Sequence, residues 1–361
     1  MNILFISHID PNPSHGLSWS VPSRVKAQME FDNVLWVNSC TGSLPHWKAV
    51  PCFHELQEYG KLNLKNMPSP FNHPDVVVFE GFYNDINEVF VGLDLSKKQI
   101  PYIIVPRSAL TYQAYNNHAW LKKRIAHFLF YNRFISKSLA IQYLTNQEKI
   151  DSEKIFNKAS FVIPNGFNTP KCHKEHFNDQ GLNAIFIGRL DIHQKGLDVL
   201  IGALSKIKEE LVANNFRLTI YGPAKADYTK LLALIESYKL NSIVSLGGET
   251  TGAAKEEVIL NSDLFVLTSR FEGHPMGLIE ALAYGLPSFV TKGSNMMDEI
   301  VSTNSGWGAN LTEESIADTI LDIIKERGEL KQKSENAIKL AREYRWSSLA
   351  EKFHNELISL L

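Results

Sequence analysis

Two glutamates, Glu272 and Glu280, stand on either side of a turn that could bind an anion, with seven residues between them. A nearly continuous apolar run from Asp263 to Thr268 precedes the turn and predicts a strand buried in a parallel sheet. Pro275 then predicts a helix that begins near Met276. The free amides and the positive dipole end of a helix N-terminus bind anions such as phosphate.

The two carboxylates suit neutral hydroxyl groups because a carboxylate accepts hydrogen bonds and repels a phosphate. Hydroxyls of a sugar and of a ribose would then flank a phosphate held by the turn. This combination favours a site for a nucleotide sugar. A plainer alternative is that one acid stabilises the helix start and that the other is solvated.

A second loop, from Gly188 to Gly196, carries two cations that suit a diphosphate. Arg189 ends a predicted strand and Lys195 follows six residues later. If both face the turn at Met276, they would clamp a diphosphate and offset the charge that grows as it leaves. The alternative is an exposed pair on a polar loop.

The Glu-x7-Glu turn resembles the signature of the retaining glycosyltransferases of family 4. Other motifs follow in that family's order: PNGF at 164–167, FIGRLDIHQKGLDVLIGAL at 186–204 and YGP at 221–223. The match is close in the C-terminal half and loose in the N-terminal half. It implies an α/β fold of GT-B architecture, with two Rossmann-like, doubly wound parallel-sheet domains facing across a cleft.

The resemblance also implies a donor site for a nucleotide-diphosphate sugar, UDP- or GDP-linked, with no other cofactor and no metal. The chain has no Asp-x-Asp pair, the magnesium anchor of the other large glycosyltransferase architecture, which favours the same conclusion. The implied donor-binding residues are Gly16, Gly188, Arg189, Lys195, Gly222, Gly248, Glu249, Glu272, Gly273, His274, Met276, Gly277, Leu278 and Glu280.

The mechanism that the resemblance implies is transfer with retention at the anomeric carbon. A double displacement would need a carboxylate nucleophile beside that carbon, and Glu272 would be the candidate. In the family, however, the matching residue binds sugar hydroxyls, while the second acid, here Glu280, binds the ribose. We therefore expect front-face attack, in which the leaving phosphate takes the acceptor's proton and Glu272, Arg189 and Lys195 have the catalytic roles. The amides of Gly277 and Leu278 are expected to hold the phosphate together with the two cations.

The N-terminal half offers three weaker candidates for contact with the acceptor or the sugar. His8 and Asp10 follow a predicted strand, Ile3 to Ser7, at the edge where open α/β sheets bind ligands, although either could be an ordinary loop residue. Arg107 follows the predicted strand Ile103 to Val105, where many relatives have a histidine. We expect Arg107 to face a phosphate or an acidic sugar.

The segment from Trp120 to Leu139 combines five lysines and arginines with several aromatic residues. One interpretation is an amphipathic surface helix that touches anionic lipid near a lipid-linked acceptor. The other, which the pattern favours, is a core helix of a doubly wound sheet with a solvated basic edge.

The amino-acid composition indicates which broad class of protein this chain belongs to. A hydrophobic share of 44%, a charged share of 21% and a net charge of −2 are typical of a soluble globular protein and argue against nucleic-acid binding. Three scattered cysteines favour a reducing cytoplasm over a disulfide framework or a zinc site. We find no signal peptide and no apolar run of about 20 residues. The expected location is the cytoplasm, with peripheral attachment to the inner face of the membrane left open.

The length of 361 residues allows about two domains. Alternating predicted strands and helices suggest two parallel sheets. We expect an acceptor-binding domain at 1–167, a linker at 168–182, a nucleotide-sugar-binding domain at 183–344, and a C-terminal helix at 345–361 that crosses back in relatives. The expected acceptor is a growing, lipid-linked surface glycan. The alternatives are a small soluble acceptor, or a non-catalytic nucleotide-sugar-binding protein.

Overall fold

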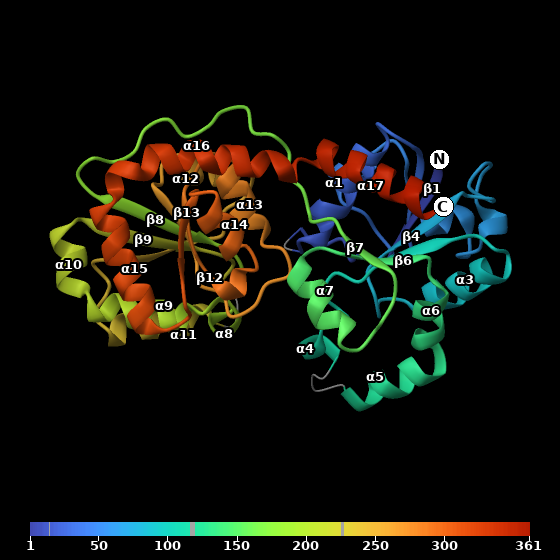
Figure 1. Cartoon of the computed structure of the whole chain (residues 1–361), viewed down its shortest axis with the longest axis horizontal. Coiled ribbons are helices and arrows are strands. Elements are labelled where there is room, and N and C mark those ends of the chain that lie inside the picture. Colours follow the sequence, from blue (N-terminus) through green and yellow to red (C-terminus); the bar gives the residue numbers. More distant parts are fainter. Residues whose placement is uncertain (14, 116–119, 225–226) are drawn as a thin grey trace. The chain divides into compact units, whose positions relative to one another are not determined.

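The computed structural model describes residues 1–361 except 14, 116–119 and 225–226 (Figure 1). The chain forms two compact units. Unit 1 comprises Met1–Asn168 and Arg345–Leu361, and unit 2 comprises Thr169–Tyr344. Each unit holds one parallel sheet with helices packed on it, as expected where strands and helices alternate.

The sheet of unit 1 has seven parallel strands in the order β3-β2-β1-β4-β5-β6-β7. Its strands are β1 (Asn2–Ser7), β2 (Asn33–Asn38), β3 (Phe53–Glu55), β4 (Val76–Glu80), β5 (Tyr102–Val105), β6 (Ala140–Tyr143) and β7 (Ser160–Val162). Strand β3 lies between Leu44 and Pro74, a stretch whose four prolines predict irregular structure. It is a short edge strand on β2, where Trp36 pairs with Phe53 and Asn38 with Glu55.

The helices of unit 1 come from both ends of the chain. They are α1 (Leu17–Gln28), α2 (Pro45–Lys48), α3 (Ile86–Lys97), α4 (Tyr112–Tyr115), α5 (Trp120–Ala126), α6 (Asn132–Lys137), α7 (Asn146–Glu153) and α17 (Trp346–Leu360). A π-helical turn, His127–Tyr131, joins α5 to α6.

Pro22 and Ser23 in the sequence predict a helix that begins near Val21, but α1 begins four residues earlier, at Leu17, so this proline lies inside the helix. Proline has no N–H and leaves the carbonyl four residues earlier without its helical donor. That carbonyl belongs to Ser18. The indole N–H of Trp47 donates to it at 2.7 Å, and His46 Nε2 also lies 2.7 Å away. Two side chains of α2 thus stand in for the missing backbone bond.

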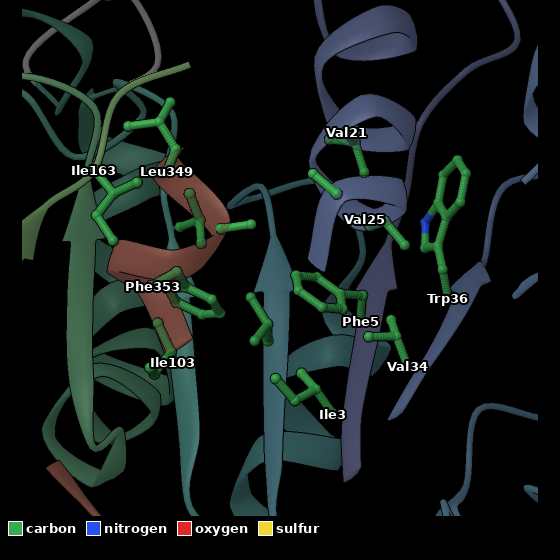
Figure 2. Close-up of a cluster of buried hydrophobic side chains, with 14 of the residues drawn as sticks. Ile3, Phe5, Val21, Val25, Val34, Trp36, Ile103, Ile163, Leu349 and Phe353 are labelled. Atoms are coloured by element: carbon green, nitrogen blue, oxygen red, sulfur yellow. The ribbon is translucent and has the colours of Figure 1, made fainter. Parts of the chain in front are cut away.

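Helix α17 completes the core of unit 1. In Figure 1 it lies beside α1, although the two are at opposite ends of the sequence. Leu349 and Phe353 of α17 belong to the same cluster as Phe5 of β1, and Figure 2 shows Phe353 on the side of the helix toward Phe5. Phe353 is 1% exposed. The start of the helix is held by the PNGF segment, since the Trp346 amide donates to the Phe167 carbonyl at 3.3 Å.

The sheet of unit 2 has six parallel strands in the order β10-β9-β8-β11-β12-β13. They are β8 (Leu182–Ile187), β9 (Phe216–Tyr221), β10 (Val244–Gly248), β11 (Leu264–Leu267), β12 (Ser288–Thr291) and β13 (Gly306–Ala309). The order reverses between β8 and β11, which pair directly. In open α/β sheets, ligands bind beyond the strand ends at such a switch point.

Helices cover both faces of this second sheet, with α13 and α16 on one face and α9 and α11 on the other (Figure 1). The helices are α8 (Ile192–Lys195), α9 (Leu197–Lys206), α10 (Lys208–Ala213), α11 (Tyr228–Ser237), α12 (Gly252–Leu260), α13 (Met276–Ala283), α14 (Met297–Ser302), α15 (Glu313–Lys325) and α16 (Leu330–Ala341).

The segment that we expected to be a linker packs along unit 2. Lys174 is buried there, and its amide donates to the Tyr284 carbonyl at 2.7 Å. Its ammonium group donates to the Leu260 carbonyl at 3.1 Å and lies 3.5 Å from the Asp263 carboxylate. These contacts attach the segment to β11 and to the helices on either side of that strand.

Candidate functional site at the switch point of the second sheet

The turn at residues 268–275 connects β11 to α13 and leaves backbone amides uncommitted. Helix α13 begins at Met276, has no acidic residue in its first turn, and has no side-chain cap. Leu278 and Ile279 both donate to the Pro275 carbonyl, at 3.0 and 3.2 Å, so the Leu278 amide that we expected to hold the phosphate is already bonded within the helix start. Among the described residues, the amides of Met276 and Gly277 have no acceptor. These two amides can therefore bind an anion at the positive end of the helix.

Glu272 lies in this turn and is paired with Lys195 from the neighbouring loop. The Lys195 ammonium donates to Glu272 Oε1 at 2.5 Å, and the two side chains are 11% and 8% exposed. The Ser269 hydroxyl donates to the same oxygen at 2.5 Å. The structure thus brings together two of the three residues that we predicted to be catalytic.

Two further residues fix the backbone of the turn. Asn295, in the left-handed conformation with φ 60°, donates through its side-chain amide to the Glu272 carbonyl. Arg270 donates to both carboxylate oxygens of Asp198 on α9, at 2.7 and 2.8 Å. Such a bidentate pair sets orientation as well as distance. The position of Glu272 is therefore determined by neighbours on three other elements.

Glu280 lies on α13, one helical turn beyond the free amides. The Lys255 ammonium, on α12, donates to its Oε2, and the two side chains are 32% and 25% exposed for Glu280 and Lys255. Glu272 and Glu280 are thus each neutralised by a lysine, Lys195 and Lys255 respectively.

Arg189, the third predicted catalytic residue, is exposed at the end of β8. Its guanidinium donates to Gln194 Oε1 at 3.0 Å, and the Gln194 side chain donates in turn to the Phe271 carbonyl at 3.3 Å. Gln194 therefore links the loop of Arg189 to the turn of Glu272. Arg189 remains accessible to a ligand from solvent.

Glycines allow the loops at this sheet edge to pack backbone against backbone. A Cβ on Gly196, which has φ 62°, would lie 2.1 Å from the Thr268 carbonyl oxygen. A Cβ on Gly222 would lie 2.2 Å from the Gly188 carbonyl oxygen, and one on Gly277 would lie 2.9 Å from that of Ile187. Real side chains do not tolerate such distances, so the loop geometry depends on glycine at these positions.

The loop after β10 carries the predicted contacts to the base and ribose. The Gly222 amide donates to the Gly248 carbonyl at 2.8 Å, which joins the YGP segment to this loop. Glu249 is exposed. Both predicted residues thus lie at the same sheet edge as the 268–275 turn.

His274 is a buried residue of the turn rather than an exposed contact. Burial lowers its pKa to about 3, so the ring is neutral at physiological pH. Its Nδ1 is buried with no hydrogen-bond partner in the described structure, and the ring lies 5.4 Å from that of Tyr344. His274 thus packs in the turn as a neutral ring.

The candidates of unit 1 follow the first strand, also at a switch point, since the order of that sheet reverses between β1 and β4. His8 Nδ1 lies 2.9 Å from the Ser39 hydroxyl, and Asp10 is exposed. Gly16 is the N-cap of α1, with an ordinary helical φ of −58°, and a Cβ added to it would meet no atom within 4 Å.

Arg107 differs from our expectation of a cation facing a phosphate or an acidic sugar. Its side chain is 6% exposed, and it donates to the buried carboxylate of Glu80 at 2.9 Å and to Asn165 Oδ1 at 3.0 Å. Arg24 of α1 donates to the other oxygen of Glu80 at 2.7 Å. The reason is the adjacency of β4 and β5, which places Glu80 beside Arg107 at the strand ends.

The described part of the chain contains neither a metal-binding cluster nor a membrane-spanning helix. No group of three or more histidine, cysteine, aspartate or glutamate side chains there is arranged to hold a metal ion. No helix in the same residues is long and apolar enough to span a bilayer.

Sequence reasoning missed three contributors to this site: Lys255, Asn295 and the Arg270–Asp198 pair. Lys255 has no local signal, because it reaches Glu280 from another helix. For Asn295 there is a weak local signal in the sequence, because asparagine tolerates the left-handed conformation better than most residues.

Comparison with known proteins identifies the second unit. The family model for glycosyl transferases group 1 matches residues 169–342. These residues belong to the glycosyl transferases group 1 family. The matched region contains β8, β11 and α13, and so the whole site described above in unit 2.

Curated relatives match this chain over only part of their own length. The putative colanic acid biosynthesis glycosyltransferase WcaL of Escherichia coli is 33% identical over 132 residues, which are 35% of this chain and 32% of that protein. Mannosylfructose-phosphate synthase of Agrobacterium fabrum is 26% identical over 215 residues, 55% of this chain and 46% of that protein. The chain thus spans 32% to 46% of the length of these relatives.

Solved structures extend the similarity in fold to the whole chain. Anabaena Alr3699/HepE in complex with UDP has a TM-score of 0.75 at 18% identity, with 99% of this chain and 100% of that one covered. Sucrose-phosphate synthase from Thermosynechococcus elongatus has a TM-score of 0.74 at 15% identity, with 100% and 99% covered. The predicted fold class, two Rossmann-like parallel-sheet domains of GT-B type, is confirmed.

Proposed function

We propose that the protein is a retaining glycosyltransferase that moves a sugar from a nucleotide-diphosphate sugar to a hydroxyl of a growing glycan. The observation that carries this proposal is the site at the β8/β11 switch point. There, two free amides, the cations Arg189 and Lys195, and the acids Glu272 and Glu280 converge on one sheet edge.

Each group has a role that fits its chemistry. The amides of Met276 and Gly277, with Arg189 and Lys195, hold the diphosphate, because all four are donors or cations. Glu280 binds the ribose hydroxyls and Glu272 binds the sugar hydroxyls, because carboxylates only accept hydrogen bonds. Binding of the donor exchanges the two lysine partners of these acids for hydroxyl groups.

The transfer is a front-face attack without a metal. The acceptor oxygen forms a bond to the anomeric carbon as the bond from that carbon to the phosphate oxygen breaks. The acceptor's proton passes to the departing phosphate, and the cations and amides stabilise the negative charge that develops there. Glu272 is bound to sugar hydroxyls and is not the nucleophile.

The donor and acceptor classes draw support from the names of relatives. The Anabaena structures contain UDP and glucose or UDP-glucose, and the Escherichia coli relative is described as a colanic acid biosynthesis glycosyltransferase. We propose a UDP- or GDP-linked donor bound by unit 2, and a lipid-linked glycan acceptor recognised by unit 1 on the cytoplasmic side of a membrane.

A thermal-shift panel tests the proposal. UDP, GDP, ADP and their sugar conjugates are added to the full chain with and without magnesium. A ligand that binds the folded state raises its unfolding temperature by mass action. We expect a shift with one nucleotide family that does not depend on magnesium and that Arg189→Ala abolishes. Arg217→Ala, a change at a distant cation of the same unit, should keep the shift. No shift with any nucleotide would contradict the proposal.

Product analysis separates transfer from binding alone. Incubation with the identified donor and a glycan acceptor should release nucleoside diphosphate, and NMR of the product should show the anomeric configuration of the donor. Binding without release in the presence of every acceptor tested would favour a nucleotide-sugar-binding protein. Release with a small sugar phosphate but not with a glycan would favour a small soluble acceptor.

A further inference from the structure

Trp19, on the first turn of α1, is held in one orientation although its side chain is 50% exposed. Its ring lies parallel to that of His46, with an angle of 3° between the planes and 4.1 Å between the centroids. Its indole N–H donates to the Pro13 carbonyl at 2.8 Å. Because His46 covers one face of the indole and Pro13 holds its polar edge, the exposed part of the side chain is the opposite face.

The orientation of His46 follows from Pro22. That proline leaves the Ser18 carbonyl without its helical donor, and His46 Nε2 donates to this carbonyl at 2.7 Å. The neighbouring Trp47, which is fully buried, donates to the same oxygen and meets His46 edge to face, at an angle of 83°. His46 is thus fixed by a hydrogen bond and by a packed ring, and it in turn fixes Trp19.

Trp19 lies at the edge of the unit 1 sheet where open α/β sheets bind ligands. The strand order reverses between β1 and β4, and α1 begins after the loop that follows β1. The Ser18 hydroxyl donates to the backbone carbonyls of Asn12 and Asp10, at 2.7 and 3.4 Å. The residue next to Trp19 therefore ties this loop to the start of α1.

An open indole face of this kind suits a sugar ring. The face of an aromatic ring carries partial negative charge, and the C–H groups on one side of a pyranose carry partial positive charge, so the two stack. A single exposed aromatic residue is ordinary on a protein surface. The ring of Trp19, however, is already held by two partners, so a ligand that stacks on it does not have to immobilise it.

The charge of the loop favours an uncharged sugar. From Met1 to Ser23 the sequence has one acid, Asp10, and no lysine or arginine. Asp10 is exposed. A carboxylate accepts hydrogen bonds from hydroxyl groups and repels a uronic acid or a phosphate. A neutral pyranose therefore fits this part of the sheet edge better than an acidic one.

We propose that Trp19 binds an uncharged pyranose ring through its open face, and that Asp10 accepts hydrogen bonds from the hydroxyl groups of that ring. Trp19 is thus a specificity-determining residue of unit 1. The identity of this sugar as part of the glycan acceptor rests on the proposed function, whereas the binding of the sugar does not.

Saturation-transfer NMR on the full chain tests the sugar site. The probes are methyl β-D-glucopyranoside, methyl β-D-galactopyranoside and methyl β-D-glucuronide, each with and without UDP or GDP, so that a donor-first order of binding cannot hide the sugar. We expect transfer to the ring C–H protons of at least one neutral sugar and weaker binding of the glucuronide. Trp19→Ala should raise the dissociation constant of the neutral sugar at least roughly five-fold, and Trp19→Phe should raise it less.

Phe90→Ala is the matched control, because Phe90 on α3 is 51% exposed, nearly the same share as Trp19. It should bind the sugars like the unaltered chain. His46→Ala removes the ring behind Trp19 and should weaken sugar binding, although less than Trp19→Ala does. All of these variants should keep the nucleotide thermal shift of unit 2.

Turnover distinguishes sugar binding from support of the fold. With the donor identified and the bound glycoside as acceptor, Trp19→Ala should raise the KM for the glycoside at least roughly five-fold and leave kcat little changed, because the indole holds the sugar in the ground state and the transition state alike. Partial unfolding would instead lower kcat and leave KM unchanged. Sugar binding at Trp19 without any nucleotide shift would reject the proposed function and retain this site.

Three results would overturn the proposal. They are no saturation transfer to either neutral sugar, equal affinity of Trp19→Ala and the unaltered chain, and equal affinity for the glucuronide and the neutral sugars. Loss of the nucleotide shift in Trp19→Ala would place the nucleobase on Trp19 instead. A dimer detected by light scattering that Trp19→Ala dissociates would assign the indole to a second copy of the chain.

Discussion

Lys195 and Glu272 form a nearly buried ion pair, with 2.5 Å between Nζ and Oε1. The proposed function gives them different ligands, the donor phosphates for Lys195 and the sugar hydroxyls for Glu272. Both groups are therefore desolvated and held in place before a donor arrives. An approaching diphosphate competes with Glu272 for the ammonium group, and the sugar hydroxyls then take the freed carboxylate oxygen.

Lys195→Met should destabilise unit 2 by about 2–4 kcal/mol, because it leaves the Glu272 carboxylate with the Ser269 hydroxyl as its remaining side-chain partner. Lys195→Met/Glu272→Gln should recover most of this loss, since no buried charge is left unpaired. Donor binding should stay lost in both variants. Urea unfolding and nucleotide-sugar titration measure the two effects. Equal stability of the single and double variants would contradict the assigned pair.

Glu280→Gln should weaken nucleotide-sugar affinity at least roughly ten-fold, because the amide is a poorer acceptor for ribose hydroxyls. Its effect on unfolding should be under about 1 kcal/mol, since the pair with Lys255 is partly exposed. Calorimetric titration measures the affinity. Lys255→Gln is the matched control: it frees Glu280 and should preserve or increase affinity. Unchanged affinity in Glu280→Gln would remove Glu280 from the ribose site.

His274 should make unit 2 less stable as the pH falls. Its pKa is about 3 in the folded protein, against an ordinary value of 6.5, so between these values the unfolded chain binds a proton that the folded chain does not. The contribution of the neutral His274 ring to the free energy of unfolding is fully present above pH 6.5. It decreases as the pH falls from 6.5 toward 3. The loss between pH 6.5 and 5 should be about 2 kcal/mol.

His274→Phe should remove this pH dependence, because phenylalanine packs without titrating. The measurement is the free energy of unfolding at pH 7 and pH 5 for the unaltered chain and for His274→Phe. His73→Gln, a change at an exposed histidine, should behave like the unaltered chain. An equal pH response in His274→Phe and the unaltered chain would mean that His274 is not buried as a neutral ring.

Glu80→Gln should destabilise unit 1 by about 3–5 kcal/mol, because Arg24 and Arg107 both lose a buried counter-charge. Burial lowers the pKa of Arg24 to about 10 even with Glu80 present, which indicates how strongly this site penalises charge. Differential scanning calorimetry with and without the nucleotide measures the effect. The nucleotide shift of unit 2 should persist. A loss under about 1 kcal/mol would show that the network contributes little.

Local patterns in the sequence predicted the elements of the site well. The apolar run that begins at Val76 predicts a strand buried on both faces at Val76–Glu80, and β4 has these bounds. The start of α13 at Met276 was also predicted, from Pro275. Pro22 misled the same reasoning for α1, because side chains of α2 replace the backbone bond that this proline removes.

The sequence by itself thus determined which residues form strands, turns and helix starts, and which groups could bind a phosphate or a hydroxyl. Only the tertiary structure decided how these groups are partnered. The pairing of β8 with β11 brings Lys195 to Glu272, the packing of α12 brings Lys255 to Glu280, and the adjacency of β4 and β5 turns Arg107 inward onto Glu80. The physical reason is the distance along the chain over which each effect acts. Backbone preferences and apolar periodicity act over a few residues, whereas these partners are set by which elements pack side by side.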